Sequence, residues 1–437
     1  MILVYTTKIT PRVRYIFKHI FTRILGINVD FTTKVEEFVA YNGMKMSYAK
    51  VPLGNEFFVK SHDLLFQQGV NHIDISISKW DNVPCFFFMG MKSSVPFDVF
   101  SASFYLITRY EEYLPHVKDE KGRFTVEQSL AYQNGFLEKP VVDIWAYKLL
   151  TLLKERFPDY VYKKRNYKFI STINVDKPFI YKNRGLFRGV GGFFNDLARL
   201  KLYKLADRIA VILNFKKDPY NTFDELIKLQ KQYNIKTIFF FLIGEYNRFD
   251  ANVSLLKRKF QLLIKDMVDY ACVGLLPSYY TMDNIKLLKY EKERMEEVTH
   301  MPTLRSRQHF LRFELPKTYQ NLIDLEIKED YSMGYASHTG FRASTCTPFY
   351  FYDIGFEIQT PLKVYPFALM DTTLKNHMKL TPKQSLGKIK DLKKQVKGVN
   401  GTFVTIFHNK SVSGYTDTWS GWGNVYDAML KIATEKE

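Results

Sequence analysis

Four short apolar runs, each followed by polar residues, constrain the fold of this chain more than any other feature. They are Phe169–Val175, Thr237–Ile243, Val273–Leu276 and Phe403–Phe407, and helix-like stretches such as Thr222–Tyr233 lie between them. Apolar strands that alternate with helices of about 10–15 residues indicate parallel βα units. The sequence therefore predicts an α/β fold built around a parallel sheet.

Polar residues just past the carboxyl ends of parallel strands usually build the site of such a fold. This rule gathers Asn174, Asp176, Ser278, His408 and Asn409 at one rim, although they are far apart in the sequence. We therefore expect a ligand or catalytic site at that rim.

The N-terminal part of the chain is predicted to form a separate, smaller α/β domain. It contains the helix-like stretches Phe100–Tyr113 and Trp145–Phe157, and the polar connector Lys163–Tyr167 follows. We place the boundary at this connector, with an accessory domain at 1–162 and the sheet-forming domain at 163–437.

A formal net charge of +18 over 437 residues bears on possible partners. A basic surface attracts nucleic acid, anionic glycans, nucleotide-linked sugars or membranes, and the alternative is a solvated surface without a partner. The chain shows neither zinc-finger spacing nor the aromatic–basic signature of an RNA-binding sheet. Nucleic-acid binding is therefore the most distant of these alternatives.

The sequence also bears on the compartment of the protein. Its three cysteines, Cys85, Cys272 and Cys346, are widely spaced and lack metal-ligand spacing, so we expect reduced packing residues. The sequence contains no uninterrupted run of about 18 apolar residues, so no membrane span is predicted. The N-terminus lacks a signal-peptide pattern. These features predict a cytoplasmic protein.

The segment from Arg12 to Gly26 has the pattern of a basic amphipathic helix. Its apolar stripe consists of Val13, Ile16, Phe17, Ile20, Phe21 and Ile24. Such a helix can lie on an anionic membrane, or it can pack on the core of its own domain. An apolar stripe most often faces a core, which favours the second alternative.

Candidate functional side chains concentrate in one arc of the C-terminal domain. Arg307 could orient a carboxylate, and Arg342 could bind a carboxylate on a ligand. Equally, either arginine could form an ion pair with Asp330 or Asp371 within the protein. His309 could be a ligand or a core histidine that hydrogen-bonds to backbone.

Several motifs in this order resemble the NodB-homology polysaccharide deacetylases, carbohydrate esterase family four. They are Pro96-Phe97-Asp98, Arg109-Tyr110-Glu111-Glu112-Tyr113, Gly122-Arg123-Phe124, Asp218-Pro219, Ser306-Arg307-Gln308-His309, Asp330-Tyr331-Ser332-Met333-Gly334-Tyr335, Gly340-Phe341-Arg342 and His408-Asn409. The chain is most similar to a bacterial branch, common in Bacteroidetes, with an extra N-terminal domain. The resemblance implies a distorted (β/α) barrel with its site at the strand carboxyl ends.

The resemblance also implies metal-dependent removal of N-acetyl groups from amino sugars. In that family one Asp and two His hold a divalent metal such as zinc, a second Asp acts as base, and a late His protonates the leaving amine. This chain departs from the pattern at two positions. Asn174 stands where the family has the Asp that acts as base, and Leu276 stands where it has a metal-binding His. An amide cannot accept the proton at neutral pH, and Leu cannot bind a metal.

The remaining candidates are assigned by what the resemblance implies. Asp176, His309 and His408 could form a reduced metal set. Asp176, which could also cap a turn, His408 and Arg307 are the candidate catalytic residues. The candidate substrate-binding residues are Ser278, Tyr279, Asp330, Arg342, Asp371 and Asn409.

Two functions remain open. The first is a carbohydrate N-deacetylase acting on a cytoplasmic amino sugar or glycan precursor. The second is a pseudoenzyme whose rim binds a sugar, a nucleotide-sugar or a protein partner without turnover. Loss of a metal ligand typically costs far more than loss of a side chain that only orients a ligand, and loss of the base removes a further factor of about 10²–10⁴ in rate. These two losses favour the pseudoenzyme.

Overall fold

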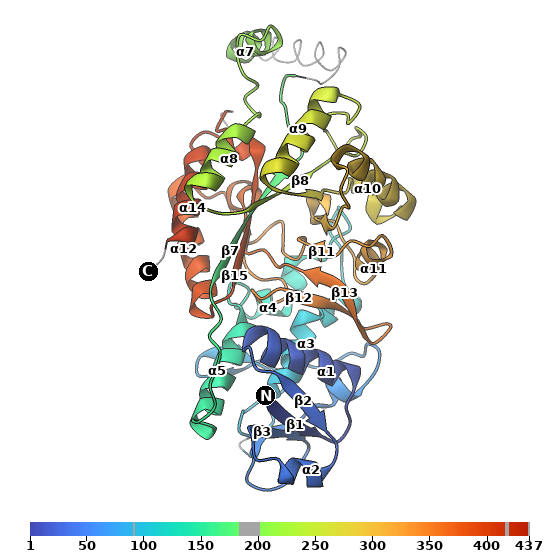
Figure 1. The fold of residues 1–437 in the computed structure, drawn as a ribbon, viewed down its shortest axis with the longest axis vertical. Helices are drawn as coiled ribbons and strands as arrows, with labels where there is room; N and C mark the ends of the chain where they lie inside the picture. Colours follow the sequence, from blue (N-terminus) through green and yellow to red (C-terminus); the bar gives the residue numbers. More distant parts are fainter. Residues whose placement is uncertain (91, 183–201, 416–418, 436–437) are drawn as a thin grey trace.

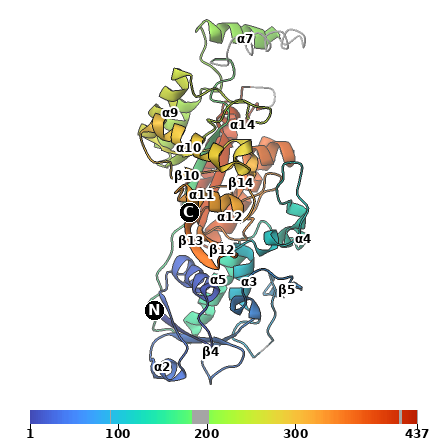
Figure 2. The same cartoon turned by 90° about the vertical axis from the view of Figure 1, so that its right-hand side faces the viewer.

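The computed structural model describes residues 1–90, 92–182, 202–415 and 419–435. Two main sheets organise the described chain, which is elongated (Figure 1). A third sheet consists only of the antiparallel strands β5 (Ser78–Trp80) and β6 (Val83–Cys85). The N-terminal sheet lies at one end of the long axis, and the larger C-terminal sheet lies in the middle (Figures 1 and 2). The sheets share no strand.

The N-terminal sheet has four strands in the order β2-β1-β3-β4, and all neighbours are parallel. The strands are β1 (Ile2–Thr6), β2 (Val29–Thr32), β3 (Lys45–Ala49) and β4 (Phe57–Lys60). Its main helices are α1 (Pro11–Phe17), the following π-helical segment η1 (Lys18–Ile24), α3 (Val99–Ile107) and α5 (Val141–Arg156). This part of the chain therefore has the α/β character that the sequence predicts, and the boundary at residue 162 stays a prediction.

The basic amphipathic segment is helical, as α1 and η1, and it packs on its own domain. Thr10 caps α1 by accepting a hydrogen bond from the Val13 amide, and Pro11 occupies the first turn, where its missing N–H costs nothing. All six side chains of the predicted apolar stripe are fully buried. The alternative in which the stripe faces a core is confirmed, and its apolar face is not free for a membrane.

The predicted helix over Phe100–Tyr113 is interrupted. Helix α3 ends at Ile107, and Arg109 takes the left-handed conformation with φ +56° before a short 3₁₀ turn. The buried Arg109 guanidinium forms ion pairs with Glu111 and Glu112. Arg109 also donates hydrogen bonds to the Arg342 carbonyl and, at 3.0 Å, to the Tyr335 hydroxyl. These distant partners help to compensate for the backbone strain, and a local helix pattern cannot report them.

The C-terminal sheet has nine strands in the order β12-β13-β11-β10-β9-β8-β7-β15-β14. Every neighbouring pair is parallel except β12 with β13. The four strands predicted from the apolar runs are β7 (Lys168–Val175), β8 (Thr237–Phe241), β9 (Cys272–Leu275) and β15 (Thr402–His408). The others are β10 (Arg305–Ser306), β11 (Glu329–Asp330), β12 (Phe349–Asp353), β13 (Ile358–Val364) and β14 (Leu369–Met370).

The sheet curls round an inner apolar cluster without closing. In the part of the chain that the structure describes, no ladder joins the two edge strands, β12 and β14. Side chains from opposite parts of the strand order nevertheless share one cluster. Its members are Ile238, Phe240, Leu242, Leu276, Leu311, Tyr331, Phe367, Met370, Val404 and Ile406. The parallel sheet expected from the sequence is present, whereas ring closure of the expected barrel is not seen.

Helices cover the outside of this sheet, as Figures 1 and 2 show. They include α8 (Phe223–Gln232), α9 (Arg258–Tyr270), α10 (Ile285–Thr299), α11 (Lys317–Asp324), α12 (Pro382–Gly398) and α14 (Trp422–Thr434). Helix α12 begins with a capping box between Thr381 and Gln384, with Pro382 in its first turn. No helix of the described residues is long and apolar enough to cross a bilayer.

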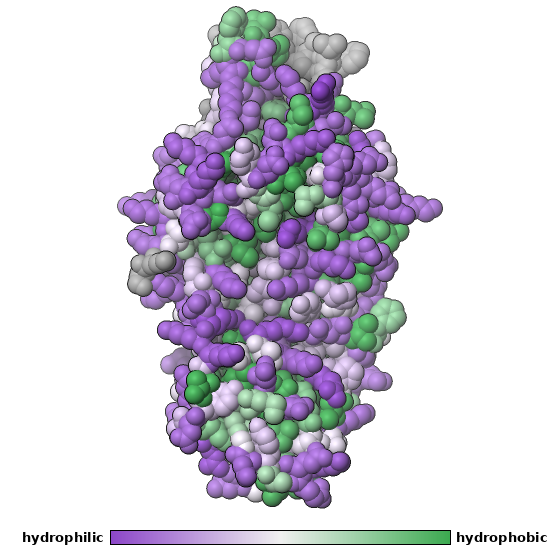
Figure 3. All heavy atoms as spheres, in the orientation of Figure 1, coloured by the Kyte–Doolittle hydropathy of each residue, from purple (hydrophilic) through white to green (hydrophobic). Residues whose placement is uncertain are grey.

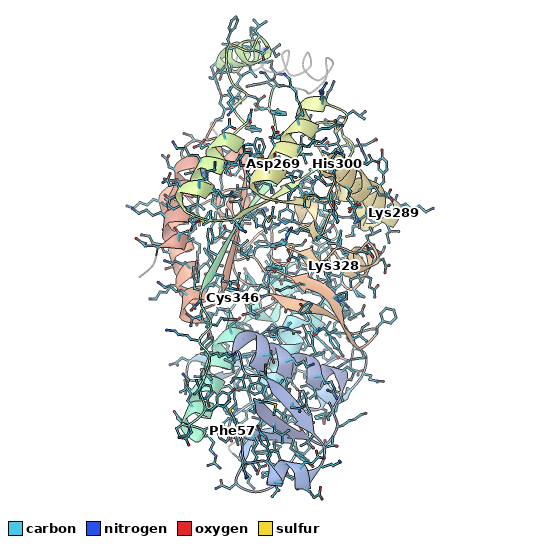
Figure 4. The ribbon with its side chains drawn as sticks, in the orientation of Figure 1. Phe57, Asp269, Lys289, His300, Lys328 and Cys346 are labelled. Carbon is cyan, nitrogen blue, oxygen red and sulfur yellow. The ribbon has the colours of Figure 1, made fainter. Side chains whose placement is uncertain are left out.

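Buried polar contacts connect the two parts of the chain. Glu112 accepts hydrogen bonds from the Arg342 guanidinium, with the shorter at 2.6 Å. Asp143 on α5 accepts a 2.6 Å bond from the Thr345 hydroxyl and a 3.0 Å bond from the Cys346 amide. Cys346 lies where the two parts meet (Figure 4). The junction is therefore built from specific ionic groups as well as apolar packing.

Candidate functional site

A pocket of about 330 Å³ lies at the carboxyl ends of β7 and β15. Its lining includes Asn174, Asp176, His309, His408 and Lys410. The fold therefore brings together the three side chains proposed as a reduced metal set, although 133 positions separate Asp176 from His309 and 99 separate His309 from His408.

The base of the pocket holds a buried Asp–His pair. Asp371 Oδ1 lies 2.7 Å from His408 Nδ1, and Asp371 Oδ2 accepts a 2.8 Å bond from the His408 amide. Ser411 also donates its hydroxyl to Asp371. Burial alone raises the pKa of Asp371, but the positive charge of a protonated His408 and these hydrogen bonds outweigh it and lower the pKa. The pair fixes the ring so that Nε2 is left for the pocket.

Asp176 is held by a lysine that the sequence analysis did not assign. Lys410 Nζ donates a 2.7 Å bond to Asp176 Oδ2, and His408 Nε2 lies 3.7 Å from the same oxygen. Burial raises the pKa of Asp176, but the nearby positive charges, that of Lys410 above all, outweigh this and hold the pKa well below its usual range. The other oxygen, Oδ1, is buried without a hydrogen-bond partner in the described residues. Asp176 is therefore ionised and has one acceptor left for a ligand.

A second Asp–His pair stands across the pocket. His309 Nδ1 lies 2.7 Å from Asp250 Oδ1, and Asp250 also accepts bonds from the Tyr279 amide at 3.0 and 3.1 Å. Asp250 is fully buried. The open question about His309 has a structural answer, since its ring pairs with a carboxylate rather than with backbone. Asp250 follows no predicted strand directly, so no sequence pattern points to it as a site residue.

Arg307 lies behind the pocket and orients the amide that replaces the expected base. Its Nη1 donates a 3.0 Å bond to Asn174 Oδ1, and its Nε donates to the Tyr331 carbonyl. Burial lowers the pKa of Arg307 to about 9, although Asp330 and Tyr331 act in the opposite direction. Neither ion pair proposed for Arg307, with Asp330 or with Asp371, is among its hydrogen bonds.

Leu276 is fully buried in the inner apolar cluster. Its neighbours there include Phe240, Leu311 and Met370. The position that the family resemblance assigns to a metal-binding histidine is thus surrounded by hydrocarbon. The change is accommodated by packing, because an apolar side chain at this point extends the core.

Some of the candidate substrate-binding residues do not line this pocket. Arg342 is engaged by Glu112. Asp330 accepts bonds from Tyr319 and from Ser332, and burial raises its pKa to about 6. The Asn409 amide donates 2.9 Å bonds to two backbone carbonyls. These side chains support the rim from outside the pocket.

The other two candidates follow β9. The Ser278 amide donates a 2.9 Å bond to Glu291, and burial raises the pKa of Glu291 to about 7. Tyr279 stacks on Phe249 with ring centroids 3.9 Å apart. Neither Ser278 nor Tyr279 lines the pocket, although both belong to the network that fixes Asp250 and His309.

Basic groups from the N-terminal part of the chain complete the mouth of the pocket. Lys121 and Arg123 line it, together with His377. Burial lowers the pKa of His377, and the positive charges of Arg123, His338 and Lys121 lower it further. This field favours a ligand that carries negative charge. The sequence contains the motif Gly122-Arg123-Phe124, but no sequence pattern predicts that this motif lies at the site.

The pocket offers an incomplete donor set for a divalent metal. Asp176 Oδ2 is bonded to Lys410. The Nδ1 atoms of His309 and His408 are each bonded to an aspartate, which leaves their Nε2 atoms as donors, as in metal-binding histidines. Leu276 offers no donor. Within the described ranges, no three or more His, Cys, Asp or Glu side chains are grouped to hold a metal ion. Asp176, whose charge a metal would neutralise, has the ammonium of Lys410 instead.

Comparison with known proteins gives one partial family match. The model of a family of unknown function, DUF7033, matches residues 2–158. This range contains the four-stranded sheet and the two basic residues at the mouth of the pocket. No curated protein matches the sequence.

Solved structures provide weak likenesses to deacetylases. A protein from Mycobacterium smegmatis described as a polysaccharide deacetylase is 11% identical, with a TM-score of 0.42, over 64% of this chain and 87% of that chain. A polysaccharide deacetylase from Bacillus cereus is 10% identical, with a TM-score of 0.30, over 61% and 86% of the two chains. A CE4 family pseudoenzyme from Bacillus anthracis is 12% identical, with a TM-score of 0.28, over 61% of each. These likenesses assign neither an activity nor a substrate to this chain.

Proposed function

We propose that this protein is a deacetylase-like pseudoenzyme that binds an anionic saccharide or nucleotide-sugar at its strand carboxyl ends. The observation that carries the proposal is the Lys410–Asp176 ion pair of 2.7 Å. It places a fixed ammonium where the family resemblance implies a divalent cation. The carboxylate is thereby neutralised without a Lewis acid.

The pocket chemistry supports an anionic ligand. Lys121, Arg123 and Lys410 contribute positive charge, and Asp176 is the single acidic side chain in the described lining. A volume of about 330 Å³ lies at the lower end of the range typical of small-ligand sites. The free Oδ1 of Asp176 can accept a bond from a sugar hydroxyl or amide N–H. The basic groups at the mouth suit a phosphate or a carboxylate on the same ligand.

Two substitutions support binding without hydrolysis. Asn174 accepts a bond from Arg307 and cannot act as base, and Leu276 removes a metal donor. The retained Asp371–His408 pair directs Nε2 into the pocket, where that atom faces an ionised Asp176 that is already bonded to Lys410. With Nδ1–H bonded to Asp371, Nε2 of a neutral His408 serves as a hydrogen-bond acceptor for the ligand.

The same Asp371–His408 pair favours one alternative, residual N-deacetylation. A buried carboxylate that orients a histidine is the arrangement of a general acid. Under this alternative the family chemistry persists at a low rate, with His408 protonating the leaving amine.

The two functions are separated by binding and turnover measured on the same protein. We would titrate the purified chain by calorimetry with N-acetylglucosamine and with its uridine diphosphate conjugate, and follow acetate release with and without added zinc or cobalt. We expect saturable binding of the charged conjugate and no acetate release. Lys410→Met should weaken this binding, whereas Lys289→Met on α10, which Figure 4 shows on the outer surface, should not.

Two results would contradict the proposal. Turnover that depends on stoichiometric metal and is lost in His408→Gln would establish the hydrolase instead. Equal affinity of Lys410→Met and the parent protein for the conjugate would remove Lys410 from the binding site.

A further inference from the structure

Helix α7 (Leu202–Ile212) and the residues just after it present several apolar side chains to solvent. The exposed fractions are 47% for Ile209, 53% for Ile212, 57% for Leu213 and 83% for Phe215. Figures 1 and 2 show α7 projecting from the end of the molecule opposite the N-terminal sheet. Figure 3 shows hydrophobic surface over this tip.

The side of α7 that faces the protein carries both apolar and polar groups, since Leu205 and Val211 are buried there at 8% and 0% exposure. Asp207 accepts a 2.6 Å bond from the Tyr415 hydroxyl, and Arg208, only 5% exposed, lies over the ring of Tyr181 at 4.9 Å. A helix on a protein surface normally buries its apolar stripe and exposes its polar one. Helix α7 buries only part of its apolar surface in this way, and the part formed by Ile209 and Ile212 stays exposed in the described structure. Exposed apolar faces of this kind mark interaction sites.

We infer that the outward face of α7 docks onto the surface of an anionic phospholipid bilayer. Between residues 202 and 217 the chain carries four basic side chains and one acidic side chain, a net charge of +3. Lys216 and Lys217 follow the helix with side chains 51% and 53% exposed, and each forms a surface ion pair of 2.6 Å, with Asp207 and with Asp224. Surface ion pairs of this kind are weak, so both ammonium groups can also reach a lipid surface. An apolar helix face flanked by lysines lies in the bilayer interface, where the lysines reach the phosphate groups.

Charge distinguishes a bilayer from a second copy of the chain. Two copies that met through α7 would bring their lysines together, within a protein whose net charge is already +18. An anionic lipid surface instead attracts these groups and accepts a short apolar face without requiring a complementary shape. This inference does not depend on what the pocket binds.

Sedimentation of the full chain with vesicles tests the inference. We would compare phosphatidylcholine vesicles with vesicles of phosphatidylcholine and phosphatidylglycerol, at low and at high salt. We expect binding to the anionic vesicles that falls as salt rises, because the Debye length shrinks from about 30 Å at 0.01 M to about 10 Å at 0.1 M. The triple variant Ile209→Ser, Leu213→Ser, Phe215→Ser should bind about tenfold or more weakly, since it removes most of the inserted apolar area.

The matched control is Val39→Ser, Val117→Ser, Val161→Ser, which removes three apolar side chains that are 64%, 71% and 86% exposed elsewhere. It should bind vesicles like the parent protein. Phe215→Trp adds an independent measure, because insertion should expose its fluorescence to quenching by brominated lipids.

Three results would overturn the inference. One is the absence of binding to anionic vesicles at low salt. Another is equal loss of binding in both triple variants. The third is a parent protein that is dimeric by light scattering without lipid, together with an α7 triple variant that is monomeric. This result would show that the exposed face of α7 contacts a second copy of the chain.

Discussion

The Nζ atom of Lys410 lies 2.7 Å from Oδ2 of Asp176, across 234 positions of the chain. The family resemblance assigns this carboxylate to a metal ion. In this chain its partner is instead a cation of the protein itself, the ammonium group of Lys410. The ammonium cannot polarise a carbonyl as a Lewis acid does, but it keeps Asp176 ionised. This ion pair is the basis of our proposal that the site binds charged groups.

Removal of this ammonium should destabilise the rim. Lys410→Met leaves Asp176 as a partly buried charge whose pKa rises towards its usual value. Since the two side chains retain 22% and 13% exposure, we expect a loss of about 1–3 kcal/mol in the free energy of unfolding. Urea denaturation at neutral pH measures it. Lys289→Met, which removes an exposed lysine from α10, should cost less than about 0.5 kcal/mol, and an equal cost in both variants would contradict the expectation.

Restoring the family side chains should raise metal affinity in steps. The double variant Asn174→Asp, Leu276→His supplies a carboxylate and an imidazole at the rim, so we expect measurable zinc binding by calorimetry. Adding Lys410→Ala should strengthen it further, because the competing ammonium is removed from Asp176. No increase in zinc affinity in either variant would mean that the rim is not arranged as the resemblance implies. Leu276→Ala with Asn174 unchanged serves as the control for disturbance of the apolar cluster.

The buried Glu112–Arg342 pair should make the junction sensitive to acid. Burial alone raises the pKa of Glu112, but Arg342 and Arg109 outweigh it and lower the pKa to about 2. A folded-state pKa below the unfolded value means that this stabilisation is present above about pH 4.5 and lost as the pH falls towards 2. Glu112→Gln should therefore cost about 3–5 kcal/mol at pH 7, and much less at pH 3.

Unfolding by urea at both pH values measures this difference. The control is Glu314→Gln, whose partner Lys118 is at the surface with both side chains more than one third exposed. Its effect should stay below about 0.5 kcal/mol at either pH. A pH-independent cost for Glu112→Gln would show that lost packing, rather than lost charge, is responsible.

Buried His19 should give a second, distinct pH dependence. Both of its ring nitrogens are buried without hydrogen-bond partners in the described structure. Burial lowers the pKa of His19 well below 6.5, and the positive charges of Arg23 and Arg165 add to this. The unfolded chain therefore binds a proton that the folded chain excludes, so stability falls as the pH drops below about 6.5, by up to about 1.4 kcal/mol per pH unit.

The variant His19→Leu should remove this dependence. Its free energy of unfolding, compared with that of the parent protein between pH 7.5 and 5.5, should change less steeply. His72→Leu is the matched control, because the His72 side chain is 79% exposed and should leave the slope unchanged. Parallel pH profiles for parent and His19→Leu proteins would contradict the assignment.

Local pattern in the sequence was enough to predict the strands β7, β8, β9 and β15, and the burial of the stripe in α1 and η1. These features depend on the spacing of apolar side chains, which reports which face of an element is buried. The same pattern failed at Arg109, where ion pairs to Glu111 and Glu112 stabilise a left-handed residue.

What the tertiary structure alone decided is which distant groups meet. The rim rule brought Asp176 and His408 to one end of the sheet, but only the folded chain pairs Asp250 with His309 and Lys410 with Asp176. Ring closure, too, depends on how the edge strands β12 and β14 are placed. Apolar periodicity is a property of neighbours along the chain, whereas a site is formed by side chains whose distances are set by strand order and by the curvature of the sheet.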